Sequence, residues 1–182
     1  MPGRFDPIIS SATNGSRRFK RNSKGSLDFW AKLKKYLDSN KVKYKALKHK
    51  LAYTAQEIAA AQDVPGKQII KSVLVKAGDK YVLAVLPAIH LIDTKKLKEI
   101  LKCKSIKIAT EKEVEKVIPD YKAGAMPPFG NLFNLETYAD KILKEDVEIV
   151  FNGGTHKDTV KMKYADFEKL AKPKVADFGK HI

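Results

Sequence analysis

The feature that most constrains the fold is a seven-residue stretch, Gly124-Ala125-Met126-Pro127-Pro128-Phe129-Gly130. Two prolines and two glycines within this stretch are incompatible with a helix interior or a central strand. The prolines fix φ, and the glycines permit backbone conformations that are closed to other residues. We therefore predict a stiff loop that can hold backbone N–H groups toward a ligand at a small entropic cost. The alternative is an ordinary turn between a helix and a strand.

Length and composition are sufficient for one domain with a sizeable core, since the chain has 182 residues and 43% hydrophobic content. No apolar run reaches the ~20 residues that cross a bilayer. The longest run, Tyr81 to Ile92, is interrupted by Pro87 and His90. A single cysteine, Cys103, excludes an intrachain disulfide and fits a reducing compartment. We predict a cytoplasmic protein without a membrane segment.

The chain is strongly basic, with 36 basic and 21 acidic residues and a formal charge of +15. Such an excess favours a polyanionic partner, either nucleic acid or an anionic membrane surface. A lysine-rich composition that serves solubility alone is the alternative. All four arginines lie within the first 21 residues. Phosphate contacts from the rest of the chain must therefore use lysine ammonium groups rather than bidentate guanidinium groups.

Residues 1–24 are rich in Ser, Asn, Gly and basic groups and show no periodicity. We interpret them as a disordered basic tail, either a cloning remnant or a targeting leader. Residues 25–182 are expected to form a single domain. Its hairpins outnumber clean βαβ units, which predicts an α/β (α+β) fold with a mixed sheet and helices packed around it.

Local patterns give approximate bounds for the elements of this domain. Ser26, Thr54, Asp93 or Thr94, and Thr110 are helix caps, and Gly78-Asp79 is the turn of a hairpin. The chain after the last helix is expected to be a tail. The expected helices span about 26–39, 54–63, 93–102, 110–118 and 164–170, and the expected strands about 42–46, 72–76, 81–86, 106–108, 132–135, 147–151 and 160–162.

Lys71 is the main candidate for chemistry. It precedes the apolar run Val73-Leu74-Val75, and strand alternation places Lys71 on the same face as Val73 and Val75. A lysine on a core-facing side is costly unless its head reaches water or a partner. Lys71 is therefore either a functional group or a snorkelling lysine at a strand end.

The other reactive residue types do not form a recognisable site. The four histidines, His49, His90, His156 and His181, lack the spacing of a zinc site, and Cys103 has no nearby ligand partner. There is no Gly-x-Ser-x-Gly elbow and no P-loop. We predict no metal and no cofactor, and neither a serine hydrolase nor an NTPase.

Three segments, taken in order, resemble one family. They are Ile70-Lys71-Ser72-Val73, the Gly124–Gly130 stretch and Asn152-Gly153-Gly154. In this order and spacing the chain resembles the YbaK/ProX-type aminoacyl-tRNA deacylases, a domain that is also inserted in bacterial prolyl-tRNA synthetases. The likeness covers about Val42 to Ala171 and includes His49 and Tyr53-Thr54.

The resemblance implies a mixed, partly rolled sheet surrounded by helices, and hydrolysis of the ester that links a wrong amino acid to the tRNA 3′ end. It implies that Lys71 is the indispensable catalytic side chain and that the backbone of the Gly124–Pro128 loop holds the aminoacyl end. The substrate's free ribose hydroxyl would help to activate the attacking water, which accounts for the missing nucleophile–base pair. The implied substrate-binding residues are His49, Tyr53, Thr54, Ser72, Gly124, Ala125, Met126, Pro127, Pro128, Asn152, Gly153 and Thr159.

Two departures from the family pattern leave the amino acid open. Some relatives carry an acidic residue where Thr159 stands here, with Asp158 beside it, and several have serine at the place of Asn152. A small amino acid such as Ala or Cys, carried by tRNA-Pro, is the expected substrate. The implied partners are aminoacyl-tRNA and an aminoacyl-tRNA synthetase, not a membrane. The alternative function is a catalytically silent tRNA-binding or synthetase-associated module of the same fold.

Overall fold

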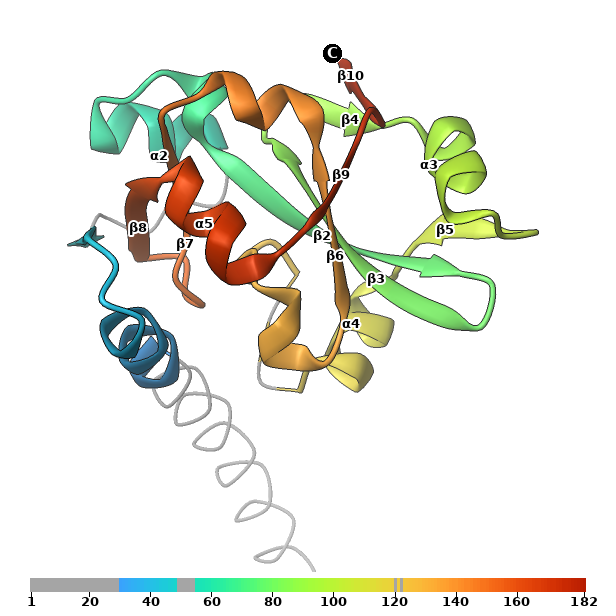
Figure 1. Cartoon of the computed structure of the whole chain (residues 1–182), viewed down its shortest axis with the longest axis horizontal. Coiled ribbons are helices and arrows are strands. Elements are labelled where there is room, and N and C mark those ends of the chain that lie inside the picture. Colours follow the sequence, from blue (N-terminus) through green and yellow to red (C-terminus); the bar gives the residue numbers. More distant parts are fainter. Residues whose placement is uncertain (1–29, 49–54, 120, 122) are drawn as a thin grey trace, which may run out of the picture.

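The structure is a computed structural model of the chain and describes residues 30–48, 55–119, 121 and 123–182 (Figure 1). None of the helices in these residues is long and apolar enough to cross a bilayer. Residues 30–39 are helical, and the further helices are α2 (Ala55–Gln62), α3 (Thr94–Leu101), α4 (Glu111–Val117) and α5 (Tyr164–Ala171) with the 3-10 helices η1 (Gly66–Gln68), η2 (Gly130–Phe133) and η3 (Lys141–Glu145). The strands are β1 (Tyr44–Lys48), β2 (Ile70–Ala77), β3 (Lys80–Pro87), β4 (His90–Ile92), β5 (Ile106–Ile108), β6 (Glu136–Asp140), β7 (Glu148–Asn152), β8 (Asp158–Lys163), β9 (Lys174–Ala176) and β10 (Gly179–His181).

The hairpin of β2 and β3 lies at the centre of a five-stranded sheet with the order β5-β2-β3-β6-β9. Ala77 pairs with Lys80, so the predicted turn at Gly78-Asp79 is confirmed. Strand β3 is covered on both faces. Leu83 belongs to the main core, and its neighbours Val82 and Ala84 belong to a second cluster under α3. A strand buried on both faces is continuously apolar, which explains the uninterrupted hydrophobic run of this segment.

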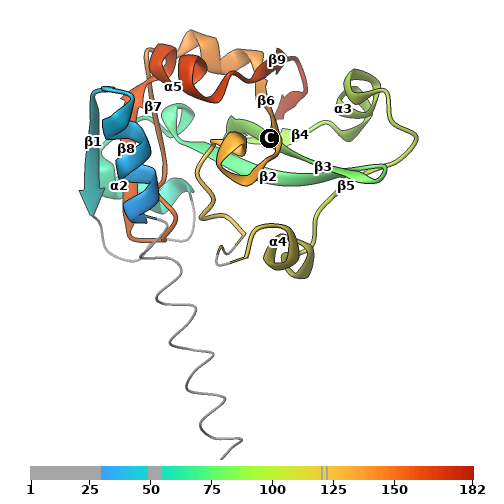
Figure 2. The same ribbon diagram turned by 60° about the horizontal axis from the view of Figure 1, so that its bottom comes forward.

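A second sheet of three antiparallel strands, β1-β8-β7, lies at one end of the molecule, and α3 lies at the opposite end (Figures 1 and 2). An isolated parallel bridge between Ile69 and Val150 joins this sheet to the start of β2. The five-stranded sheet combines antiparallel hairpins with parallel pairs of β6 to β3 and to β9. The predicted mixed α/β fold is confirmed, whereas the division into a basic tail and one domain stays a prediction because residues 1–24 lie outside the described residues.

Two predicted helix caps are confirmed in detail. The Asp93 carboxylate accepts hydrogen bonds from the backbone N–H groups of Lys95 and Lys96 at the start of α3. Thr110 and Glu113 form a complete capping box at the start of α4. The Thr110 backbone N–H, aided by Lys107, lowers the pKa of Glu113 to about 2. The carboxylate therefore keeps its capping role well into the acidic range. The predicted cap Ser26 lies outside the described residues.

The predicted strand over 132–135 is wrong. Residues 130–133 form the 3-10 helix η2, and Asn134 adopts a left-handed conformation with φ of 56°. The Gly130 N–H donates to Thr137 Oγ1 at 3.0 Å, and the Leu135 N–H donates to the Gly130 carbonyl. These bonds turn the chain back on itself, so the strand starts later, at Glu136 in β6.

The predicted C-terminal tail is also wrong. Strand β9 pairs in parallel with β6, and β10 pairs antiparallel with β4. Phe178 between them is fully buried, and its N–H donates to the buried Asp140 carboxylate at 2.9 Å. Val175, Ala176 and Phe178 are the apolar residues of 174–181, and their spacing does not give the alternation that predicts a strand.

The main core gathers around Phe129 at the end of the proline-containing stretch. The ring is fully buried and makes edge-on contacts with Tyr36, Phe151 and Phe167, with centroid distances of 5.6–5.7 Å. These three partners come from the first helix, β7 and α5. The Phe129 side chain therefore anchors the proline-containing stretch to three different elements of the core.

We expect the substitution Phe129→Leu to destabilise the protein by roughly 0.5–1.5 kcal/mol for each aromatic pair that is lost. Phe178→Leu is the matched control, because Phe178 is equally buried but lies in the second cluster. Urea unfolding measures both variants. Equal losses of unfolding free energy in the two variants would contradict a special role of the Phe129 ring contacts.

Candidate active site

The Gly124–Pro128 loop is held by its own side chains. Ala125, Met126, Pro127 and Pro128 are buried, whereas Gly124 is exposed. Met126 lies in the same core as Phe129. Gly124 has a φ of +88°, a conformation that L side chains rarely adopt. The loop is therefore a fixed ridge whose exposed part is the Gly124 backbone.

Asn152 clamps this loop from β7. Its Nδ2 donates to the Gly124 carbonyl at 2.7 Å. Its Oδ1 is buried and has no hydrogen-bond partner in the described structure. Buried acceptors are normally satisfied, so an unpaired one at a loop indicates a place for a donor from a ligand or water. The structure thus brings together two segments that the sequence analysis predicted to share a site.

The turn between β7 and β8 is shaped by glycines and by an acidic residue. A Cβ on Gly153 would lie 2.5 Å from the Trp30 ring, so this position has no room for a side chain. Thr155 Oγ1 donates to Asp158 Oδ2 at 2.6 Å, and the Asp158 N–H donates back to Thr155 Oγ1 at 3.0 Å. Asp158 Oδ1 is buried and has no partner in the described part. It is a second open acceptor in this region.

Lys71 lies at the start of β2, half-buried, and its Nζ donates to the Ala88 carbonyl at 3.3 Å. Burial lowers the pKa of the Lys71 ammonium. Lys71 follows Ile69 by two residues, and Asn152 follows Val150 by two residues. Because the Ile69–Val150 bridge is parallel, Lys71 and Asn152 both lie two residues beyond it in the same direction along the two strands. The hydrogen bond of Lys71 goes to Ala88 and not to the Gly124 loop.

The two faces of β2 pack against different hydrophobic clusters. Ile70 and Leu74 belong to the main core, and the buried Ser72 lies between them on the same face of β2. Val75 lies in the second cluster, with half-buried Val73 packed against it. The face of β2 that carries Lys71 therefore packs against the second cluster. Lys71 itself is half-buried at the end of the strand, so its ammonium group lies near the surface.

The remaining predicted site residues are placed differently. Thr159 is fully buried and donates its hydroxyl to the Leu47 carbonyl at 3.3 Å, so its side chain supports the pairing of β8 with β1. His49, Tyr53 and Thr54 lie outside the described residues, and their roles stay predictions.

The site also contains residues that the sequence analysis did not single out as site residues. A Cβ on Gly124 would lie 3.9 Å from His156 Cε1, so the imidazole borders the loop. A Cβ on Gly154 would lie 3.1 Å from Tyr121 Oη. His156 and Tyr121 lie here because the turn after β7 contacts the loop, and this contact is formed only in the folded chain. Among the described residues no group of three or more His, Cys, Asp or Glu is placed to hold a metal ion.

The sequence of the chain matches the model of the aminoacyl-tRNA editing domain over residues 49–170. The chain belongs to this family. The proline–tRNA ligase of Bacillus subtilis (strain 168) is 33% identical over 105 residues, which cover 57% of this chain and 18% of the ligase. That of Thermotoga neapolitana is 34% identical over 106 residues, which cover 58% of this chain and 18% of the ligase. The match thus spans about one fifth of these relatives.

Solved structures agree on the editing-domain fold. A proposed trans-editing enzyme for prolyl-tRNA synthetase superposes with a TM-score of 0.73 at 22% identity, covering 84% of this chain and 97% of that one. A hypothetical protein superposes with a TM-score of 0.76 at 20% identity, covering 82% of this chain and 99% of that one. The resemblance stated from the sequence is therefore confirmed at the level of family and fold.

We expect Asn152→Ala to loosen the editing-domain loop while the fold persists. The change removes one hydrogen bond to Gly124, a loss of about 1 kcal/mol. Hydrogen exchange should become faster at the amides of residues 123–126 and stay unchanged in β3. Asn131→Ala is the matched control, because Asn131 is also an exposed amide donor but bonds Tyr36. Equal protection of residues 123–126 in wild type and Asn152→Ala would show that the clamp does not hold the loop.

Proposed function

We propose that this chain hydrolyses the ester bond of mischarged tRNA that carries a small amino acid, with alanine or cysteine on tRNA-Pro as the first candidates. The observation that carries this proposal is the arrangement at the junction of the two sheets: a half-buried lysine at the start of β2 and a loop clamped by Asn152. The family membership and the names of the relatives support the same substrate class. The setting would be the cytoplasm, with no cofactor.

The reaction adds water to the ester carbonyl and then breaks the bond to the ribose oxygen, which takes up a proton and leaves as a hydroxyl. The amino acid leaves as a carboxylate. Negative charge develops on the carbonyl oxygen in the transition state, and preorganised donors stabilise it. The Lys71 ammonium and the backbone N–H groups at the start of the loop, before Pro127 and Pro128, are the candidate donors, because proline has no N–H. The free ribose hydroxyl of the substrate would assist the attacking water.

The open acceptors near the turn suggest where the amino group binds. Asn152 Oδ1 and Asp158 Oδ1 are both buried and unpaired in the described part. An α-ammonium group has three donors and a positive charge, which suit a carboxylate and an amide oxygen.

The deciding experiment is release of amino acid from a panel of mischarged tRNAs, including Ala-tRNA-Pro, Cys-tRNA-Pro and correctly charged Pro-tRNA-Pro. We expect release from at least one small mischarged amino acid and little from Pro-tRNA-Pro. Background rates without protein provide the control. If no member of a broad panel is hydrolysed above background, the chain is a silent tRNA-binding or synthetase-associated module instead.

We expect Lys71→Ala to lower the deacylation rate about a hundredfold to a thousandfold, which corresponds to the loss of one donor at a developing charge. Lys71→Arg should restore only part of the rate, because a planar guanidinium places its donors differently. Lys76→Ala is the matched control on the same strand, since Lys76 pairs with Glu113 away from the loop. The melting temperature is measured for all three.

The control separates chemistry from stability. A Lys71→Ala protein that keeps the wild-type rate would defeat the catalytic assignment. A rate loss that is matched by Lys76→Ala, or that accompanies unfolding, would do the same and would leave Lys71 as a snorkelling structural residue.

A further inference from the structure

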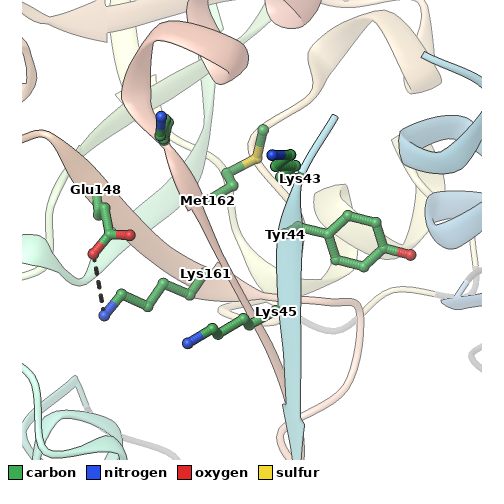
Figure 3. A pocket seen from close by; sticks show the side chains of 7 residues that line it. Lys43, Tyr44, Lys45, Glu148, Lys161 and Met162 are labelled. Carbon is green, nitrogen blue, oxygen red and sulfur yellow. Dashed lines mark ion pairs between the residues drawn. The ribbon is translucent and has the colours of Figure 1, made fainter. Parts of the chain in front are cut away.

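Four lysines gather on the outer face of the three-stranded sheet, and we call them the lysine face: Lys43, Lys45, Lys161 and Lys163 (Figure 3). Lys45 and Lys161 are direct cross-strand partners in the pairing of β1 with β8. Tyr44 and Met162 form the next pair and turn inward, where Met162 is buried in the main core. Figure 3 shows Lys45 and Lys161 extending away from the direction of the Tyr44 ring. Lys43 and Lys163 share that outer side by alternation.

Like charges directly opposite each other on a sheet are destabilising. Glu148 neutralises one of the four, since it forms an ion pair with Lys161 at 3.2 Å. No ion pair of Lys43, Lys45 or Lys163 is found within the described residues. One carboxylate, Glu148, thus stands beside four lysines, since it is also the cross-strand neighbour of Lys163. The face keeps an excess of positive charge, and an anion from outside the chain would offset the repulsion between Lys45 and Lys161.

The surface between these lysines is hollowed. The four lysines border a depression of about 210 Å³ whose lining residues also include Tyr44, Glu148 and Met162 (Figure 3). Burial and the Asp38 carboxylate raise the pKa of the Tyr44 hydroxyl to about 12, so this residue adds no negative charge at neutral pH. The depression is bordered by cations and contains a single carboxylate. A phosphate group fits this chemistry.

The lysine face continues directly from the candidate active site. Strand β8 starts at Asp158, in the turn that borders the loop, and ends at Lys163. At about 3.3 Å per residue, Lys161 lies ~10 Å and Lys163 ~17 Å along the strand from Asp158. An elongated polyanion whose end enters the site would pass over these lysines.

We propose that the lysine face binds the sugar–phosphate backbone of the tRNA acceptor stem while the aminoacyl end lies at the Gly124 loop. The inference rests on the proposed function for the identity of the RNA. Lysine ammonium groups read charge rather than base sequence, so the contact positions the stem without selecting its sequence. Selectivity for the tRNA would then come from elsewhere.

The test measures binding of an uncharged tRNA-Pro transcript to the full chain by fluorescence anisotropy at several KCl concentrations. The variant Lys43→Gln/Lys45→Gln/Lys163→Gln removes the three unpaired lysines and leaves the Lys161–Glu148 pair. We expect about tenfold weaker binding and a salt slope smaller by roughly 2–3, one phosphate contact for each lysine. The charge-preserving variant Lys43→Arg/Lys45→Arg/Lys163→Arg should bind like wild type.

The matched control is Lys95→Gln/Lys98→Gln/Lys102→Gln on and beside α3, which removes the same charge from the opposite end of the molecule (Figures 1 and 2). We expect it to change affinity less than twofold. Equal losses in both triple variants would overturn the lysine face as a site. Loss of binding to phosphatidylserine vesicles without loss of tRNA binding would overturn it in favour of a membrane surface.

Activity distinguishes this inference from the proposed function. If mischarged tRNA is hydrolysed, the triple glutamine variant should raise KM and keep kcat, because the lysines do not touch the reacting ester. If nothing is hydrolysed but the glutamine variant still loses tRNA affinity selectively, the deacylase proposal fails and the lysine face stands. If hydrolysis occurs and tRNA affinity is unchanged in the variant, the lysine face fails alone.

Discussion

The packing of Phe129 is the constraint on which the candidate site depends. Its ring contacts Tyr36, Phe151 and Phe167, so the first helix, β7 and α5 all meet at the end of one loop. Prolines alone would stiffen the loop without placing it. The buried Phe129 ring fixes one end of the loop in the core, and the hydrogen bond from Asn152 holds the other end, Gly124, against β7. A preorganised backbone of this kind is what electrostatic stabilisation of an oxyanion requires.

The second constraint is the meeting of two sheets through a single bridge. Lys71 and Asn152 belong to different sheets, and the Ile69–Val150 bridge brings the two strands together at this point. The lysine and the loop clamp therefore come from two sheets that share one hydrophobic core.

Much of the fold could be predicted because its signals are local. The β2–β3 hairpin, the Asp93 and Thr110 caps and the turn after Asn152 each depend on a few neighbouring residues. The predicted strand over 132–135 is wrong because the Gly130 N–H bonds the Thr137 side chain, seven residues later, and this turns the chain there. Within the site, Lys71 and the loop carry recognisable patterns. The positions of His156 and Tyr121 and the open oxygen of Asp158 arise from tertiary contacts that no local pattern encodes.

The strands β9 and β10 have a consequence for how this chain is made. β6 lacks one of its partners, and the second cluster lacks Phe178, until residues 174–181 are available. β1 likewise waits for β8, which follows it at a great distance in sequence. Such nonlocal pairing is slow to form. During synthesis on the ribosome the hairpin can form early, but the three-stranded sheet is complete only once residue 163 has emerged, and the five-stranded sheet only once residue 176 has emerged.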